Sequence, residues 1–338
     1  MIVIVPVHAM NTKQVIYMNN QARIAILLPC YNEALTITKV IRDFQTVLPS
    51  AEIWVYDNNS GDNSTELAIA AGANIRRVRQ QGKGHVVRRM FQEIEADCYV
   101  MADSDDTYPA DEVGKLIGPI LSGDADMVNG DRLSSTYGKE NKRPMHNFGN
   151  SLVCGLISLL FRQRILDVMT GYRAFSRKFV KNCPVWASGF EVETELTLFA
   201  LDRRMNILEV PITYRDRPSG SLSKLNTVRD GMRVLKTIFN LFRNYRPMLF
   251  FGTIAWVLGL LSTVLFIPIF SEYLRTGLVP RFPTLIGCGV GLICGLLSFV
   301  CGLILESTKK YSDQIFEILV SQENERSANH GDSRKTDC

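Results

Sequence analysis

The amino-acid sequence predicts an α/β protein with a mostly parallel sheet, followed by an amphipathic helix and two transmembrane helices. Strand and helix patterns alternate from residue 23, which is typical of a parallel sheet covered by helices on both faces. Residues 226–245 carry apolar side chains on one helical face. Residues 247–270 and 282–305 contain no charged residue, and each is long enough to cross a hydrocarbon core of about 30 Å. These observations divide the chain into an N-terminal extension over 1–20, an α/β domain over 21–225, an interfacial helix over 226–246, a membrane hairpin over 247–305 and a polar, partly disordered tail over 306–338.

Composition excludes several classes of protein. The 338 residues are 46% hydrophobic and 21% charged, which is ordinary for a globular chain and excludes a disordered one. The two uncharged segments argue against a purely cytosolic protein, and the soluble composition before Pro247 argues against a polytopic transporter. The eight cysteines show no CxxC and no zinc spacing, so we expect reduced packing residues. We expect no nucleic-acid partner.

The elements of the α/β domain follow from apolar runs separated by turn and capping signals. Pro49 and Gly72, for example, are stop signals for the helices that precede them. The patterns predict strands over 23–29, 52–57, 74–79, 98–105, 125–131 and 207–215, and helices over 33–48, 63–71, 83–94, 111–121, 147–161 and 190–205.

The distribution of basic residues predicts the membrane topology. Several arginines and a lysine precede the first apolar segment, and Lys309 and Lys310 follow the second. The loop 271–281 between them holds only Arg275 and Arg281 as basic residues. The positive-inside rule therefore places the α/β domain and the tail in the cytoplasm. The helix over 226–245 suits a position on anionic headgroups, and its alternative is packing against the sheet.

A stripe of small residues marks the second apolar segment. Gly287, Gly291 and Gly295 are spaced four apart, so they share one helical face. Such stripes let helices approach closely in lipid. The partner is either the first apolar segment or another subunit of a homo-oligomer.

Acidic side chains follow several predicted strands. Asp57, Asp103, Asp105 and Asp131 all fall at carboxyl ends, where ligands bind in parallel α/β sheets. Two carboxylates separated by one residue can both reach a hard divalent cation, which often shares its oxygen ligands with substrate phosphates. The alternative for the Asp103-Ser104-Asp105 turn is helix capping.

These motifs together resemble glycosyltransferase family 2, and the later ones resemble its polyprenyl-phosphate branch. The resemblance covers roughly residues 23–310 and implies a GT-A fold with a Rossmann-like sheet. It departs at Thr107, where the mannose synthases often carry glutamine as a third metal ligand. The motifs are Pro29-Cys30-Tyr31-Asn32-Glu33, Asp57-Asn58-Asn59-Ser60 with Asp62, Gly82-Lys83-Gly84, Asp103-Ser104-Asp105, Gly130-Asp131-Arg132, Asp167-Val168-Met169-Thr170-Gly171-Tyr172-Arg173, and Arg217 with Gly220 and Ser223-Lys224-Leu225.

The resemblance implies a donor site for a UDP-sugar. Pro29, Tyr31 and Glu33 would hold the nucleoside, and Asp57 would accept from uracil or ribose unless it only caps the turn over 58–62. Lys83 is either a phosphate contact or a helix-start residue. Asp103 and Asp105 would hold Mg²⁺ or Mn²⁺ on the diphosphate.

The acceptor implied by the resemblance is a polyprenyl phosphate. Arg132, Arg143, Arg217 and Lys224 are the candidate contacts of its phosphate, and the alternatives are solvated side chains or, for Lys224, a headgroup anchor. Asp167 is a metal ligand, a base or a residue that orients an arginine. Glu191, Glu193 and Glu195 begin a helix and are expected to be mainly structural, with Glu191 a weaker candidate for sugar contacts.

The expected activity is inverting transfer of a hexose, most simply glucose, from UDP-hexose to undecaprenyl or a related polyprenyl phosphate at the bacterial inner membrane. A processive polysaccharide synthase is a rival, but the sequence lacks the QxxRW motif typical of that class. A non-catalytic, membrane-anchored protein that binds nucleotide sugar is a second rival.

Overall fold

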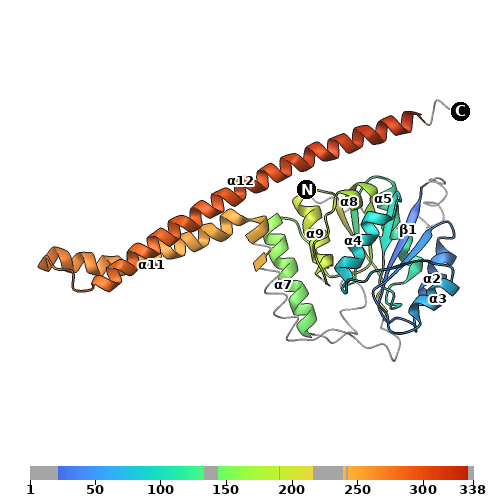
Figure 1. Cartoon of the computed structure of the whole chain (residues 1–338), viewed down its shortest axis with the longest axis horizontal. Helices are drawn as coiled ribbons and strands as arrows, with labels where there is room; N and C mark the ends of the chain where they lie inside the picture. The colour runs from blue at the N-terminus through green and yellow to red at the C-terminus, as the bar shows by residue number, and fades with distance from the viewer. Residues whose placement is uncertain (1–21, 133–143, 190, 216–238, 241–242, 334–338) are drawn as a thin grey trace. The chain divides into compact units, whose positions relative to one another are not determined.

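The computed structural model describes residues 22–132, 144–189, 191–215, 239–240 and 243–333. The chain separates into two compact units, residues 1–231 and residues 232–338 (Figure 1). The predicted extension over 1–20, most of the predicted interfacial helix, and Arg143, Arg217 and Lys224 lie outside the described residues.

The first unit is built on a seven-stranded sheet, as the alternating patterns predict. Its strand order is β3-β2-β1-β4-β6-β5-β7. β6 runs antiparallel to both β4 and β5, and the other neighbouring pairs are parallel. The strands are β1 (Ile24–Cys30), β2 (Glu52–Asp57), β3 (Asn74–Arg77), β4 (Cys98–Met101), β5 (Met127–Asp131), β6 (Arg173–Ser176) and β7 (Ile207–Pro211).

Helices cover both faces of this sheet, and buried side chains fill the two spaces between them. The helices are α2 (Ile37–Val47), α3 (Ser64–Ala70), α4 (Lys83–Glu93), the short 3₁₀ helix η1 (Ala110–Glu112), α5 (Val113–Leu121), α7 (Pro144–Phe161), α8 (Arg177–Asn182) and α9 (Val192–Asp202). Helices α2, α3 and α5 contribute to the core on one face. On the other face, Phe91 of α4 and Phe179 of α8 pack against Phe175 of β6.

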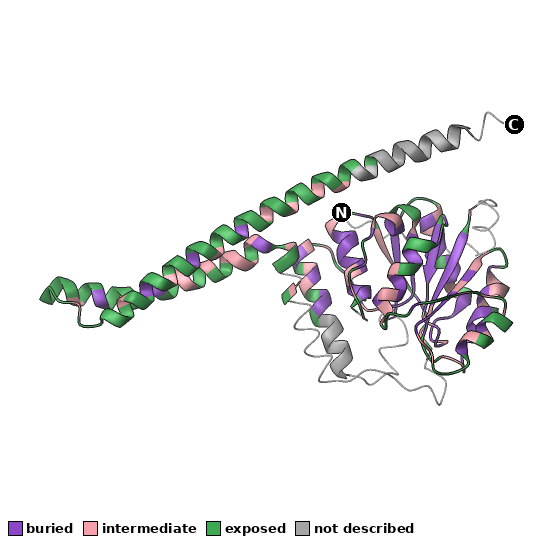
Figure 2. Cartoon of the chain, in the orientation of Figure 1, coloured by how far each residue is buried: buried purple, intermediate pink, exposed green. Residues whose placement is uncertain are grey.

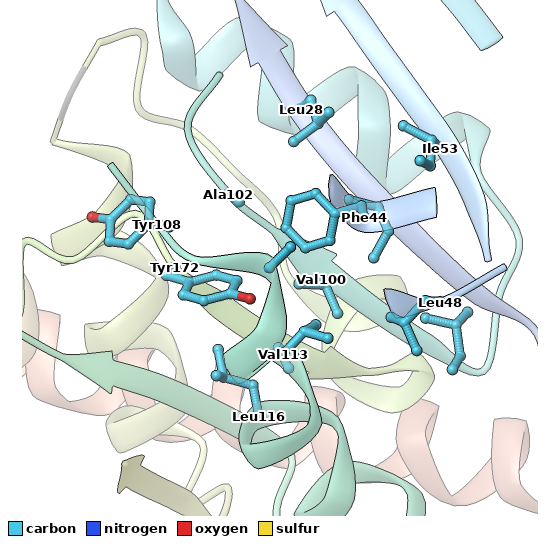
Figure 3. Close-up of a cluster of buried hydrophobic side chains, with 14 of the residues drawn as sticks. Leu28, Phe44, Leu48, Ile53, Val100, Ala102, Tyr108, Val113, Leu116 and Tyr172 are labelled. Atoms are coloured by element: carbon cyan, nitrogen blue, oxygen red, sulfur yellow. The ribbon is translucent and has the colours of Figure 1, made fainter. Parts of the chain in front are cut away.

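One core lies between β1 and helices α2 and α5. Ile24, Ile26 and Leu28 alternate along β1 and point into it, because successive side chains of a strand face opposite ways. Phe44 of α2 lies at the centre of this cluster and meets Tyr172 edge-on, with 6.5 Å between ring centroids (Figure 3). Ala25 and Leu27 are equally buried on the other side, as expected for a central parallel strand.

Two elements of the first unit were not predicted. Strand β6 has four residues, one of them arginine, and it is wholly or largely buried. Short length and a buried charge hide it from apolar patterning. Helix α8 follows directly, and the Ser176 hydroxyl at its start accepts a hydrogen bond from the backbone N–H of Phe179. The predicted strand over 98–105 is also too long, because β4 ends at Met101 and the acidic residues form a turn.

The second unit contains the two long apolar helices. They are α11 (Pro247–Thr276) and α12 (Phe282–Ser333), and both are candidate membrane spans by length and composition. Their apolar side chains are largely exposed, in contrast to the buried sheet of the first unit (Figure 2). Helix α12 continues well beyond residue 305, so the tail predicted to be partly disordered is helical as far as Ser333.

The small-residue stripe of α12 lies against α11. A Cβ atom on Gly291 would stand 2.3 Å from the Ser262 hydroxyl, and one on Gly295 would stand 3.2 Å from the Ala255 carbonyl. Nothing lies within 4 Å of the corresponding position on Gly287. Of the two partners considered for this stripe, the first apolar helix is therefore the one that Gly291 and Gly295 contact.

Candidate active site

The candidate site forms where β1, β2 and β4 end at the same edge of the sheet. Cys30 at the end of β1 lies in register with Asp57 at the end of β2. The loops that follow these strands hold each other: the Ser60 hydroxyl accepts from the Asn32 N–H at 2.9 Å, and the Ser64 hydroxyl accepts from the Glu33 N–H at 2.9 Å. The turn over 29–33, which is predicted to bind the nucleoside and is called the first turn below, is thus fixed by the loop after β2.

The acidic turn after β4 is bonded to the same first turn. The Ser104 hydroxyl donates to the carbonyl of Pro29 at 2.8 Å. The Thr36 hydroxyl donates to the carbonyl of Ser104 at 2.6 Å. Because both hydroxyls are consumed in bonds between loops, Pro29, Asp103 and Asp105 hold fixed relative positions.

Asp105 is held by the residue that departs from the family pattern. It is buried, and its Oδ1 accepts from the Thr107 hydroxyl at 2.6 Å and from the Thr107 N–H at 3.2 Å. Thr107 is fully buried. Thr107, which stands where the family often has a glutamine metal ligand, therefore orients the predicted metal ligand Asp105 through its hydroxyl.

Lys83 joins the acidic turn to a distant helix. Its Nζ lies 2.5 Å from Asp103 Oδ1 and 2.6 Å from Oε1 of Glu193, near the start of α9. Burial alone would lower the pKa of Lys83, but the Asp103 and Glu193 carboxylates raise it well above its ordinary value, so the ammonium stays charged. Lys83 begins α4, as one of its two sequence interpretations has it, and it also lies in the site.

Three glycines permit this close assembly. Gly82 has a φ of +130°, which favours glycine, and a Cβ there would stand 2.0 Å from the Ser188 carbonyl oxygen. A Cβ on Gly84 would stand 2.1 Å from the Ala187 carbonyl oxygen, and one on Gly171 would stand 2.5 Å from Asp103 Oδ2. The Gly82-Lys83-Gly84 motif thus allows the backbone over 187–188 to approach α4.

The three glutamates at the start of α9 have different partners. Glu191 accepts from the backbone N–H groups of Ser188 and Gly189, and Glu195 accepts from those of Trp186 and Ala187, so both hold the backbone that precedes α9. Glu193 differs because its Oε1 is bonded to Lys83 in the site. Sequence reasoning missed this role, since alternating acids at a helix start carry the same local signal whatever they contact.

Asp57 and its neighbour fix the loops beside the first turn. Both oxygens of the buried Asp57 carboxylate lie within 3.3 Å of the Ser60 N–H, so this residue does cap its own turn. The Asn58 amide nitrogen donates to the carbonyls of Val78 and Gln80, and its oxygen accepts from the Gly82 N–H at 2.7 Å. Asn58 therefore ties the end of β2 to the loop that begins α4.

Arg132 and Asp167 form a buried pair beyond β5. Arg132 Nε lies 2.7 Å from Asp167 Oδ2, and a terminal guanidinium nitrogen lies 3.0 Å from Oδ1. Burial alone would raise the pKa of Asp167, but Arg132 lowers it below its ordinary value. The guanidinium also stands over the ring of Tyr214, 5.4 Å from its centroid. Among the three roles considered for Asp167, this geometry matches orientation of an arginine.

Glu209 of β7 supports the loop that carries Asp167. Its carboxylate accepts from the N–H of Leu166 at 3.0 Å and from that of Asp167 at 3.3 Å. Burial raises the pKa of Glu209 to about 7, although these backbone donors oppose the shift. Glu209, which holds the loop that carries Asp167, therefore has a pKa near neutral pH.

The acidic turn fits a hard divalent cation. Asp103 and Asp105 supply carboxylate oxygens, which Mg²⁺ and Mn²⁺ prefer, and the Asp103 side chain is 30% exposed. Within the part of the chain that the structure describes, no three His, Cys, Asp or Glu residues are placed to hold a metal together. A cation here would therefore complete its coordination with oxygens from a ligand or water.

Comparisons with known proteins agree with this architecture. The family model described as Glycosyl transferase family 2 matches residues 25–183. The glycosyltransferase AglJ of Haloferax volcanii is 32% identical over 69% of this chain and 76% of its own length. The dolichyl-phosphate hexose transferase of the same organism is 30% identical over 64% of this chain and 92% of its own length. The crystal structure of glucosyl-3-phosphoglycerate synthase from Mycobacterium tuberculosis shares the fold, with a TM-score of 0.56, 24% identity and coverage of 70% of this chain and 82% of that one.

Proposed function

Because the chain belongs to glycosyltransferase family 2, with a GT-A-like fold and two candidate membrane spans, we propose that it transfers a hexose from UDP-hexose to a polyprenyl phosphate. The observation that carries this proposal is the Asp103–Asp105 turn, bonded through Ser104 to the first turn at the carboxyl edge of the sheet. The name of the dolichyl-phosphate hexose transferase supports a lipid-linked acceptor phosphate. Glucose is the proposed sugar and undecaprenyl phosphate the proposed acceptor.

The donor would lie along the loops that follow β1, β2 and β4. Tyr31 is 37% exposed and therefore accessible to a nucleoside base, with Pro29 and Glu33 in the same fixed turn. Asp57 would contribute to the same subsite while capping its own turn. The mycobacterial synthase was crystallised with Mn²⁺ and UDP, which supports a comparable donor for this fold.

Asp103 and Asp105 would hold the divalent cation, either Mg²⁺ or Mn²⁺. When bound, the cation would neutralise charge that develops on the departing nucleoside diphosphate. Thr107 keeps the Asp105 carboxylate in one orientation, so this carboxylate would need little reorganisation when the donor binds. The fixed turn would also keep the two carboxylates on one side of the donor.

The acceptor phosphate is itself the nucleophile. It is an anion at neutral pH and needs little help from a base, but its charge must be offset beside a diphosphate. Arg132, Arg143, Arg217 and Lys224 are the proposed contacts, with Asp167 holding Arg132 in place. Attack of a phosphate oxygen on the anomeric carbon, in line with departing UDP, would invert the configuration.

The apolar helices and the distribution of basic residues support a membrane arrangement. We propose that α11 and the apolar part of α12 cross the bacterial inner membrane, with the α/β unit and the C-terminal tail in the cytoplasm. The segment over 226–246, which the sequence predicts to be an amphipathic helix, would lie at the headgroups and bring the acceptor phosphate to the depth of the site. Any homo-oligomer would form within this membrane part.

The reaction can be tested on membranes that contain the overproduced protein. They are incubated with a panel of isotope-labelled nucleotide sugars, and the extracted lipids are identified by mass spectrometry. We expect a polyprenyl monophosphate carrying one hexose, formed from UDP-glucose and absent with an Asp105→Asn variant. A long polymer would favour the processive synthase, and UDP binding with no product from any donor would favour a non-catalytic binding protein.

A further inference from the structure

Lys83 lies between two carboxylates inside the site. Its Nζ is 2.5 Å from Asp103 Oδ1 and 2.6 Å from Glu193 Oε1, and its side chain is only 9% exposed. A buried ammonium at hydrogen-bond distance from two carboxylates is held firmly, because leaving either one exposes an uncompensated charge. One of the two carboxylates belongs to the acidic turn, and the other belongs to α9.

The two ends of this bridge differ in their surroundings. Asp103 is 30% exposed at the edge of the sheet, whereas the Glu193 side chain is 6% exposed. The second oxygen of Glu193, Oε2, is buried and has no hydrogen-bond partner among the described residues. Glu193 is therefore the enclosed end of the bridge, and Asp103 is the end that an arriving ligand would reach.

We propose that Lys83 is a resident counter-cation of Asp103, which occupies a carboxylate oxygen that a divalent cation would share and moves to the diphosphate when the donor binds. Glu193 is then a positioning residue that keeps the ammonium within reach of both. This inference rests on the proposed function, since it takes Asp103 as a metal ligand.

Charge explains why the bridge must change when a donor arrives. An ammonium and a divalent cation at one carboxylate repel each other. Without nucleotide, Lys83 therefore lowers the affinity of the site for the metal. A nucleoside diphosphate supplies new anionic oxygens for the ammonium, and the flexible four-carbon stem of lysine permits the shift. Metal and nucleotide therefore favour each other's binding.

The test measures Mn²⁺ binding to the purified full-length protein in detergent, by electron paramagnetic resonance of the free ion. The key variant is Lys83→Met/Glu193→Gln. Its site has the same net charge as the wild type, because one positive and one negative charge are removed together. A change in Mn²⁺ affinity therefore reports the loss of a local competitor rather than a change in overall charge.

Without nucleotide, we expect this double variant to bind Mn²⁺ about tenfold more tightly than the wild type, a change that corresponds to about 1.4 kcal/mol. Glu193→Gln alone should bind Mn²⁺ more weakly than the wild type, because it leaves the lysine and removes a negative charge. Adding Asp105→Asn to the double variant should abolish the tight binding, which locates it at the acidic turn. Equal or weaker binding by the double variant, or tight binding that survives Asp105→Asn, would overturn the proposal.

The second half of the proposal is tested with UDP at saturating Mn²⁺, by calorimetry. The double variant should bind UDP about tenfold more weakly, since no ammonium is available to the diphosphate. Unchanged UDP affinity would overturn the movement of Lys83 to the donor. Circular dichroism spectra and melting temperatures confirm that each variant is folded. Because neither measurement uses sugar transfer, failure of the proposed reaction would appear separately, as absence of any glycolipid product.

Discussion

Arg132 and Asp167 are joined by two hydrogen bonds inside the first unit, Nε to Oδ2 at 2.7 Å and a terminal nitrogen to Oδ1 at 3.0 Å. The Arg132 side chain is 8% exposed and that of Asp167 is fully buried. A planar guanidinium paired in this way has one orientation. The residue proposed to receive an acceptor phosphate is therefore held in advance by a carboxylate that is not itself at the surface.

We predict that Asp167→Ala destabilises the protein by about 3–5 kcal/mol, because it removes the carboxylate that accepts two hydrogen bonds from the buried Arg132 guanidinium. The double variant Arg132→Met/Asp167→Ala should lose less stability than the single variant, since the buried guanidinium is removed together with its carboxylate. Thermal unfolding in detergent provides the measurement. A double variant that is at least as unstable as Asp167→Ala would show that the pair is not the source of the loss.

We predict that Asp105→Asn abolishes sugar transfer and leaves the fold intact. The change removes one negative charge from the proposed metal site but keeps an oxygen that can accept from Thr107. Product formation is measured with labelled donor, and melting temperature is the control for folding. Near-normal turnover of the variant in the presence of EDTA would show that the reaction needs no metal.

We predict that Arg143→Ala and Arg217→Ala each reduce transfer to polyprenyl phosphate at least about tenfold. Loss of one guanidinium from a desolvated charged contact costs on the order of 2–5 kcal/mol, and each 1.4 kcal/mol of that in the transition state is about tenfold in rate. UDP affinity, measured by calorimetry with metal, should change little. Lysine should restore little activity, since it lacks the planar fork.

The rival interpretation makes these two arginines headgroup anchors or solvated side chains. It expects normal turnover of both variants in detergent, a result that would reject the acceptor assignment. Loss of UDP binding would instead move the arginines to the donor site.

We predict that both ends of the membrane hairpin face the cytoplasm. On a cysteine-free background, Leu278→Cys should react with a membrane-impermeant maleimide in intact cells, and Glu325→Cys should react only after permeabilisation. Permeabilised cells provide the control that both positions are accessible in principle. The opposite labelling pattern would reverse the topology.

We predict that Glu209 makes stability depend on pH near neutrality. Its pKa is about 7 in the folded protein against an ordinary 4.5, so the folded state holds this proton more tightly than the unfolded state. The resulting contribution to the free energy of unfolding is fully present below about pH 4.5 and is lost as pH rises through about 7. Glu209→Gln keeps an acceptor for the Leu166 N–H and should remove this dependence. At pH 8 the variant should be more stable by about 1–3 kcal/mol. Unfolding curves from pH 5 to 8 give the comparison, and parallel pH profiles of the two proteins would contradict it.

Local sequence patterns predict most of the sheet because its central strands are continuous apolar runs. β1 and β2 agree with the predicted ranges to within one residue. β6 could not be found in this way, because its Arg173 is buried and satisfied by the carbonyls of Val168 and Thr170 and by the Thr197 hydroxyl. Val168 and Thr170 precede Arg173 closely in the sequence, whereas Thr197 of α9 becomes its neighbour only through the fold.

In the candidate site, too, some residues carry a local sequence signal and others are recognised only from their contacts in the fold. Two acids one residue apart beside an apolar run mark Asp103 and Asp105 as candidate metal ligands, although the predicted strand over 98–105 includes them and β4 ends at Met101. Nothing local distinguishes Glu193 from Glu191 and Glu195, since its contact with Lys83 joins helices far apart in the sequence. Likewise, the pairing of Arg132 with Asp167 depends on the loop that Glu209 supports.

Helix α12 is one continuous element of 52 residues. At 1.5 Å per residue it is about 78 Å long, more than twice the thickness of a hydrocarbon core of about 30 Å. Its polar end therefore projects far past any bilayer that its apolar part crosses. Since no break separates the two parts, a rotation or tilt of the span would be carried as a lever movement to the polar end, where the displacement is amplified by the length of the projecting arm.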